Sequence, residues 1–221
     1  MKEIIDFLVQ LSLHNDREWF MNHKEEYVRL NARFNTFVEG LIAGISHFDE
    51  RVRGLAVKDC TFRIYRDMRF SQGKPPYNAR FSAYVCPRGK MSGYAGYYVH
   101  IEPGENLLFL CSGLYNPTPA VLQAIREDIE YNPTEFREAL AQCVDFDLPW
   151  DRALKKVPRE FDPADEQAAY YRLRSYELVK NVTLHEVLDA HFLEQCVAHF
   201  ARTYSYNCLM NRCVDFVAGE E

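Results

Sequence analysis

The sequence predicts an α+β fold in which one mainly antiparallel sheet is flanked by N-terminal and C-terminal helices. Apolar residues recur at three- and four-residue spacing before residue 46 and again after residue 117, as on one face of a helix. Between residues 60 and 112 the apolar period changes to two, as in half-buried strands. No repeat, low-complexity tract or Ser/Gly-rich linker divides the chain, so residues 1–221 are expected to form a single domain.

The N-terminal part is expected to be helical. Residues 4–13 carry one apolar stripe, and a second stripe continues for more than five turns up to residue 45. Asn15 precedes Glu18, and Asn22 precedes Glu25, by the three residues of a capping box. In that arrangement the side chains satisfy the first free backbone N–H groups of a helix. The two pairs therefore predict two helix starts.

The middle of the chain is expected to form a meander of short antiparallel strands separated by turns that contain Gly and Pro. Phe62 and Ile64 alternate with Arg63 and Tyr65, which predicts that the first two side chains face the core. The expected strands begin at Cys60 and continue at residues 81–86, 94–102 and 107–112.

Helices are expected to return after the meander. Thr118 before Pro119, and Asn132 before Pro133 with Glu135 two residues later, each predict a helix start. Thr183 with Glu186 has capping-box spacing. The remaining expected elements are two short strands and a C-terminal helix, at residues 154–158, 170–176 and 189–217.

The composition excludes several classes of protein. With 26 basic and 32 acidic residues the net charge is −6, which argues against nucleic acid as a partner and against a polybasic membrane binder. No apolar run reaches the roughly 18 residues that span a bilayer, and charged residues near the start differ from a secretory leader. We therefore expect a cytoplasmic protein with no membrane contact.

The seven cysteines indicate neither a disulfide framework nor a zinc site. Their number is odd and no Cys-x-x-Cys pair occurs. Several stand where an apolar residue would repeat, so they are expected to be small buried residues that stay reduced.

Residues 63–80 are strongly basic although the whole chain is acidic. This stretch holds five cations against the single acid Asp67; the cations are Arg63, Arg66, Arg69, Lys74 and Arg80. Two interpretations are open: the arginines pair with carboxylates elsewhere and pin a long connection, or they form an anion site on a loop. Residues 119–148 are acidic, which is typical of a solvated helical face.

Several short motifs resemble one protein family. The longest is FRIYRDMRFS at residues 62–71, followed by Lys74, Pro76 and Tyr77. Others, in order, are NDREWF at 15–20, His23-Lys24 with Tyr27, GYY at 96–98 with His100-Ile101, GLY at 113–115 with Pro117, Ile125-Arg126, and Lys156 with Pro158 and Phe161.

Together these motifs resemble the bacterial and fungal family called domain of unknown function 2461, over nearly the whole chain. The sequence departs from the family at Asn78, where members commonly carry a lysine, and at Pro75, where they commonly carry a small hydroxyl residue. If that lysine contacts a ligand in relatives, this chain binds it more weakly or differently. The resemblance implies no particular activity.

Strand alternation predicts one polar face of the sheet. Tyr98, His100 and Glu102 share a face of the strand at 94–102, and Arg63, Tyr65 and Asp67 would join them if the strands are neighbours in register. Such a face could carry out acid–base chemistry, with His100 or Asp67 as the proton carrier. The alternative interpretation is that His100 is an ordinary hydrogen-bonded strand histidine.

No metal and no cofactor are predicted. His100 and Glu102 supply only two ligands, and His23 is not spaced to complete a recognised set. The dinucleotide, Walker, nucleophile-elbow and His-Glu-x-x-His motifs are all missing from the sequence.

Two functional hypotheses follow, and the sequence does not decide whether the protein is an enzyme. In the first, Arg63, Arg66, Arg69 and Lys74 bind a small phosphorylated or carboxylated ligand, with Tyr77 and His100 at the rim. In the second, the basic loop of a non-catalytic module docks an acidic protein segment or a nucleic-acid backbone. An enclosed pocket that joins Arg66, Tyr77 and His100 would favour the first, and a flat basic strip the second. A third possibility is that the arginines are all paired internally.

Overall fold

The computed structural model of the chain describes residues 1–67, 69 and 73–219, and its centre is a four-stranded antiparallel sheet in the order β1-β2-β3-β4. The strands are β1 (Phe81–Val85), β2 (Gly96–Glu102), β3 (Leu107–Leu114) and β4 (Tyr176–Asn181). This meander confirms the predicted α+β class and the three central strands.

Helices precede and follow the first three strands. The N-terminal helices are α1 (Lys2–Leu13), α2 (Arg17–Asn22), α3 (Lys24–Ile45) and α4 (Val57–Cys60). Those after β3 are α5 (Pro119–Tyr131), α6 (Pro133–Gln142), α7 (Ala168–Tyr171), α8 (Leu184–Leu188), α9 (Phe192–Ala201) and α10 (Tyr204–Ala218). Short 3-10 turns lie at Glu50–Val52, Pro103–Glu105 and Trp150–Arg152.

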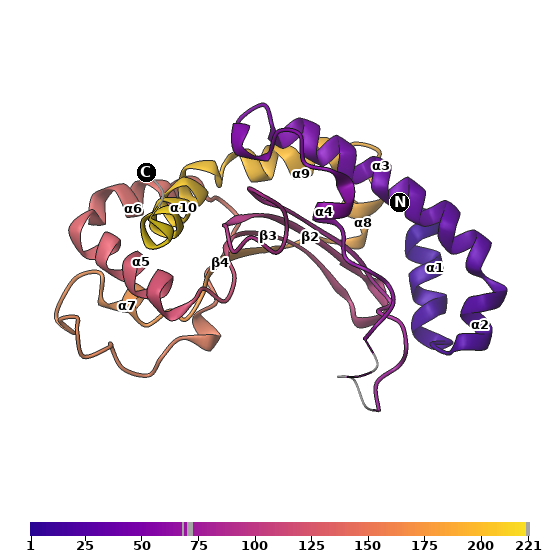
Figure 1. Cartoon of the computed structure of the whole chain (residues 1–221), viewed down its shortest axis with the longest axis horizontal. Helices are drawn as coiled ribbons and strands as arrows, with labels where there is room; N and C mark the ends of the chain where they lie inside the picture. Colours follow the sequence, from indigo (N-terminus) through magenta and orange to yellow (C-terminus); the bar gives the residue numbers. More distant parts are fainter. Residues whose placement is uncertain (68, 70–72, 220–221) are drawn as a thin grey trace.

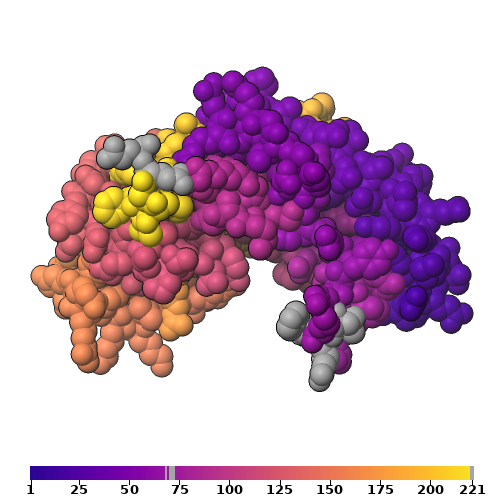
Figure 2. Space-filling view, in the orientation of Figure 1, coloured from indigo at the N-terminus to yellow at the C-terminus, as the bar shows by residue number. Residues whose placement is uncertain are grey.

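The molecule has the shape of an arch (Figure 1). Helices α3 and α9 lie over one face of the sheet, α1 and α2 lie beyond one side of it, and α5, α6 and α10 lie beyond the other. The opposite face of the sheet is the inner side of the arch, and the space-filling view shows it hollowed (Figure 2). We call this inner surface the concave face.

The covered face of the sheet supplies the hydrophobic core. Tyr97, Val99 and Ile101 of β2 alternate with the residues of the concave face and are each 1% exposed. They belong to one continuous apolar cluster that also includes residues of α1, α3, α5 and α10. The pleat of the strands therefore decides which side chains reach the concave face.

Buried amide side chains attach α10 to the sheet. Asn211 Oδ1 accepts a hydrogen bond from Ala95 N at 2.8 Å, and its Nδ2 donates to Ala95 O at 3.2 Å. Asn207 Nδ2 donates to Gly96 O at 3.3 Å and to Ser112 Oγ at 3.0 Å. Unpaired backbone groups at this point would be costly, since they are buried.

The prediction of a strand from Cys60 to residue 65 is wrong. Cys60 ends α4, and the segment that follows makes only isolated bridges, from Thr61 to Ala83 and from Tyr65 to Tyr77. Ile64 is buried as expected, but Phe62 is 40% exposed. Phe62 N still donates to Ser82 O of β1 at 3.2 Å, but from Ile64 onward the chain pairs with the residues before Ala79 instead, so no regular strand forms.

The helix caps expected at Asn15 and Asn22 are wrong by one residue. The cap of α2 is Asp16, which accepts a hydrogen bond from Trp19 N, and α3 begins after His23 without a side-chain cap. The side chain of Asn15 is used elsewhere, because it bonds the backbone of Tyr77.

The C-terminal expectations are partly confirmed. The cap at Thr118 and the capping box at Thr183 are present, whereas the Asn132 side chain donates to Asp128 and does not cap α6. Residues 154–158 form no strand, and residues 170–176 hold the end of α7 and only the first residue of β4. Two helices, α9 and α10, replace the single helix expected at the C-terminus. The helical path is interrupted between them, at the buried Thr203.

All seven cysteines are free. Burial raises the pKa of Cys60 to about 11 and that of Cys86 to about 12, so neither thiol is ionised near neutral pH. In the part of the chain that the structure describes, no helix is both long and apolar enough to cross a bilayer.

Asn15→Ala should lower the free energy of unfolding by about 1–3 kcal/mol. Asn15 Nδ2 donates to Tyr77 O at 3.0 Å and Asn15 Oδ1 accepts from Tyr77 N at 3.1 Å, so the substitution leaves two partly buried backbone groups without partners. Urea denaturation would measure the loss. Asn22→Ala is the matched control: Asn22 is exposed at the end of α2, and its loss should change stability by less than about 0.5 kcal/mol. If both substitutions lowered the free energy of unfolding equally, the stabilising role of the Asn15–Tyr77 hydrogen bonds would be contradicted.

Thiol titration of the denatured protein without reductant should find seven free groups. A reproducible count of five would reveal a native disulfide and would contradict the expectation of a reducing compartment.

Candidate functional site

The concave face carries polar and aromatic side chains. Strand register places Ser82, His100 and Phe109 in one row, and Tyr84, Tyr98 and Cys111 in the next. Glu102 at the end of β2 and Glu177 of β4 complete the face. The predicted grouping of Tyr98, His100 and Glu102 on one face is therefore correct.

These three residues of β2 form a hydrogen-bonded chain. His100 Nε2 lies 2.8 Å from Glu102 Oε2, and His100 Nδ1 lies 2.8 Å from the Tyr98 hydroxyl. A carboxylate only accepts, so Nε2 carries the proton, and in a neutral imidazole Nδ1 then accepts from Tyr98. We call Tyr98, His100 and Glu102 the relay.

The electrostatics of the relay favour a neutral histidine. Burial lowers the pKa of His100, and the hydrogen bond to Glu102 opposes this effect. Burial raises the pKa of Tyr98, so its hydroxyl keeps its proton. Arg80 lies 3.9 Å from the same Glu102 oxygen that His100 contacts. A proton taken up at Tyr98 could move the phenolic proton to His100, where Glu102 would stabilise the imidazolium.

Residues 63–67, 69 and 73–80 form an extension beside the concave face, which we call the basic arm (Figure 1). Its two sides pair as a short ladder: Arg66 N donates to Pro76 O at 2.9 Å and Asn78 N donates to Ile64 O at 2.7 Å. Residues 68 and 70–72 of the motif lie outside the described residues.

The cations of the arm have different surroundings. Arg69 pairs with Asp67 at 2.7 Å, and this contact lowers the pKa of Asp67. Arg66 Nε donates to the neutral amide oxygen of Asn78 at 3.1 Å. Within residues 1–67, 69 and 73–219, neither Arg63 nor Lys74 forms an ion pair. Full internal pairing of the arm therefore does not occur among these residues.

Two other predicted site residues, Asp67 and Tyr77, do not contact the relay in the described structure. Asp67 lies in the arm, and no hydrogen bond between described residues joins it to His100. Tyr77 is 5% exposed and stacks on Phe20 of α2 at 3.9 Å, so it faces the N-terminal helices.

Sequence reasoning missed three groups of the concave face: Phe62, Phe109 and Arg80 in contact with Glu102. Phe109 stacks on His100 with ring centres 4.4 Å apart, and the Phe62 ring lies 6.1 Å from Tyr98. Alternation along residues 107–114 could have placed Phe109 on one face, but its position over His100 needs the register of β2 with β3.

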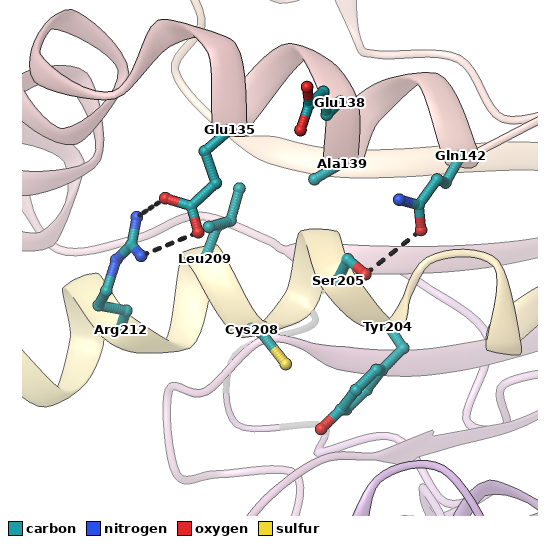
Figure 3. Close-up of a pocket in the computed structure, with 9 residues that line it drawn as sticks. All are labelled: Glu135, Glu138, Ala139, Gln142, Tyr204, Ser205, Cys208, Leu209 and Arg212. Carbon is teal, nitrogen blue, oxygen red and sulfur yellow. Dashed lines mark hydrogen bonds and ion pairs between the residues drawn. The ribbon is translucent and has the colours of Figure 1, made fainter.

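A shallow depression lies between α6 and α10, far from these residues in sequence (Figure 3). Its volume is about 490 Å³. Its lining includes the acidic residues Glu135 and Glu138, and its Arg212 donates to Glu135 at 2.9 Å and to Asp128 at 2.8 Å. Because that guanidinium is already neutralised, the depression is a poor anion site. In the described part of the chain no three His, Cys, Asp or Glu side chains are grouped so as to hold a metal ion.

The fold and the concave face define an α+β protein whose sheet is covered by helices on one side and carries polar, titratable groups on the other. The chain belongs to the family of conserved hypothetical proteins DUF2461, whose family model matches residues 3–207. No curated protein and no solved structure matches the chain. The resemblance seen in the sequence motifs is thereby confirmed.

We predict that the pKa of His100 in the folded protein lies below its ordinary value of about 6.5. Because the unfolded chain then binds more protons, stability should be fully present above about pH 6.5 and decrease as the pH falls toward the folded pKa. NMR titration of the imidazole C–H signals would measure the pKa of His100. His100→Gln should reduce the acid sensitivity of the melting temperature.

The appropriate comparison is His199→Gln, because burial also lowers the pKa of His199. The two substitutions separate the two contributions to acid sensitivity. A His100 pKa above 6.5 would contradict the neutral relay.

Proposed function

We propose that the protein binds a small phosphorylated or carboxylated ligand at the concave face, beside the basic arm. One observation carries the proposal: Arg66 is held in place by a neutral group. Its Nε donates to Asn78 Oδ1, and the Asn78 Nδ2 donates to Arg63 O at 3.4 Å. The terminal amino groups of Arg66 have no partner among the described residues. The guanidinium is therefore oriented but not neutralised, and its two terminal N–H groups remain available to an anion.

The charge distribution supports an anion at this position. Arg63, Arg66 and Lys74 lie within twelve residues, and the acid of the segment, Asp67, is engaged by Arg69. Like charges so close together repel one another. A bound phosphate or carboxylate would relieve that repulsion, and arginine forks match the geometry of either group.

An enzymatic role would use the relay. We propose His100, rather than Asp67, as the proton carrier, because Asp67 is engaged by Arg69 whereas His100 has a neutral, accepting nitrogen. A ligand O–H or N–H would transfer its proton to the Tyr98 oxygen as the phenolic proton moves to His100 Nδ1. The charge on Glu102 would stabilise the resulting imidazolium.

A second candidate function is the docking of an acidic protein segment. It is favoured by the exposure of Arg63, Arg69 and Lys74, which would present a strip rather than an enclosed pocket. Arg69 is paired with Asp67, so this strip is less cationic than its arginine content indicates. A Glu-rich peptide serves as the probe for this alternative.

We predict that inorganic phosphate raises the melting temperature in a saturable way. A ligand at about five times its Kd should stabilise the protein by about 1 kcal/mol, or about 2–4 °C for a chain of this size. Arg66→Gln should abolish the shift. Asn78→Ala should weaken it, since the charge remains but the orienting acceptor is lost.

Arg53→Gln is the control, because Arg53 is an exposed arginine whose only ion pair within the described residues is with Glu50, three positions earlier. It should leave the phosphate response unchanged. If neither phosphate nor a simple carboxylate shifts the melt and only the Glu-rich peptide binds, the docking function replaces the proposal. If Arg66→Gln instead destabilises the unliganded protein by roughly 3–5 kcal/mol, the arm is structural.

A further inference from the structure

Five neighbouring rings form an aromatic cluster on the concave face, with two of them edge-on to the central ring. Tyr98 lies at its centre, with ring centres 6.1 Å from Phe62, 6.2 Å from Tyr84, 5.8 Å from His100 and 6.0 Å from Phe109. His100 and Phe109 are nearly parallel, at an interplanar angle of 9°. We call these five residues the aromatic plate.

The plate is not part of the hydrophobic core. Phe62, Tyr84, Tyr98 and Phe109 all lie outside the apolar cluster that holds the fold together. Phe62 is 40% exposed, and the other three are half-buried. Single exposed apolar side chains are common on protein surfaces, but contiguous ones on a hollowed face mark a binding site (Figure 2).

Cations lie at the edge of the plate. Lys90 Nζ is 6.0 Å from the centre of the Phe62 ring, and Arg63 follows Phe62 in the chain. Arg80 is 3.9 Å from Glu102, the terminal residue of the relay. Ser82, in register with His100, is 2% exposed and belongs to the same row of the concave face.

We propose that the ligand is a planar aromatic ring linked to an anionic group, with the ring on the aromatic plate and the anion at the arginines of the arm. This inference rests on the proposed anion binding and specifies the ligand class. Aromatic side chains stack on any planar ring, and a ring bound beside cations gains cation–π attraction as well. A nonplanar anion of equal charge would gain neither.

A small ligand fits this site better than a nucleic-acid strand. Strand binding relies on many cations along a groove, whereas this chain is acidic overall, with a net charge of −6. A mononucleotide and a nucleic-acid strand both contain planar rings and phosphates, so the test includes an oligonucleotide.

The experiment compares two matched pairs of compounds by calorimetry and thermal shift with the full chain. Adenosine monophosphate and ribose 5-phosphate share a phosphate and a sugar, and benzoate and cyclohexanecarboxylate share a carboxylate. In at least one pair the planar member should bind roughly ten-fold more tightly. Phe62→Leu should remove most of that ratio, whereas Arg66→Gln should weaken both members.

The control is Tyr131→Leu, which removes an aromatic ring that is 77% exposed at the end of α5. It should leave the ratio unchanged. Phe62 is partly exposed, so Phe62→Leu is expected to fold, and Phe109→Leu tests the plate independently.

Equal affinities within both pairs would overturn the inference and leave anion binding standing. Failure of all four compounds and of inorganic phosphate would overturn both proposals. Binding of a ten-nucleotide oligomer, with no binding of the mononucleotide, would overturn the small-ligand class.

Discussion

The attachment of α10 to one face of the sheet is the constraint on which the rest of the structure depends. Asn207 and Asn211 satisfy backbone groups at the start of β2, and Thr203 Oγ1 lies 2.6 Å from Ser112 Oγ of β3. These contacts are buried and directional, so they select both the face and the register of the packed helix. Once that face is committed to the core, the alternate residues of every strand must lie on the concave face.

The parts of the fold that sequence predicts are those governed by local patterns. Alternation located the central strands, and the caps at Thr118 and Thr183 depend only on neighbours a few residues away. Phe62 was misplaced for the opposite reason. Its orientation depends on the pairing of Ile64 with Asn78 across the arm, and nothing within residues 60–65 reveals that partner. The side chain of Asn15 likewise bonds Tyr77, 62 residues away.

In the candidate site, too, the residues predicted from the sequence are those that a local pattern brings together. Tyr98, His100 and Glu102 are spaced by two on one strand, so their meeting could be predicted from sequence. Phe109 and Arg80 approach them from other segments, and their positions follow from cross-strand register. The expected strand at residues 170–176 is replaced by the end of α7. Tyr171 is the last residue of this helix and Leu173 follows it, and both are buried, so their spacing of two imitates the alternation of a strand.

The relay and the aromatic plate share His100, and under the proposed function this shared residue would link ligand stacking to proton transfer. Phe109 covers one side of the imidazole, and burial already lowers the pKa of His100. A ring seated on the plate would exclude more water and favour the neutral, accepting form further. Glu102 faces both His100 and Arg80. A ligand anion that engages Arg80 would leave the Glu102 carboxylate to His100 alone, which strengthens its stabilisation of an imidazolium. Ligand binding would thus prepare the histidine to receive a proton and the glutamate to stabilise it afterwards.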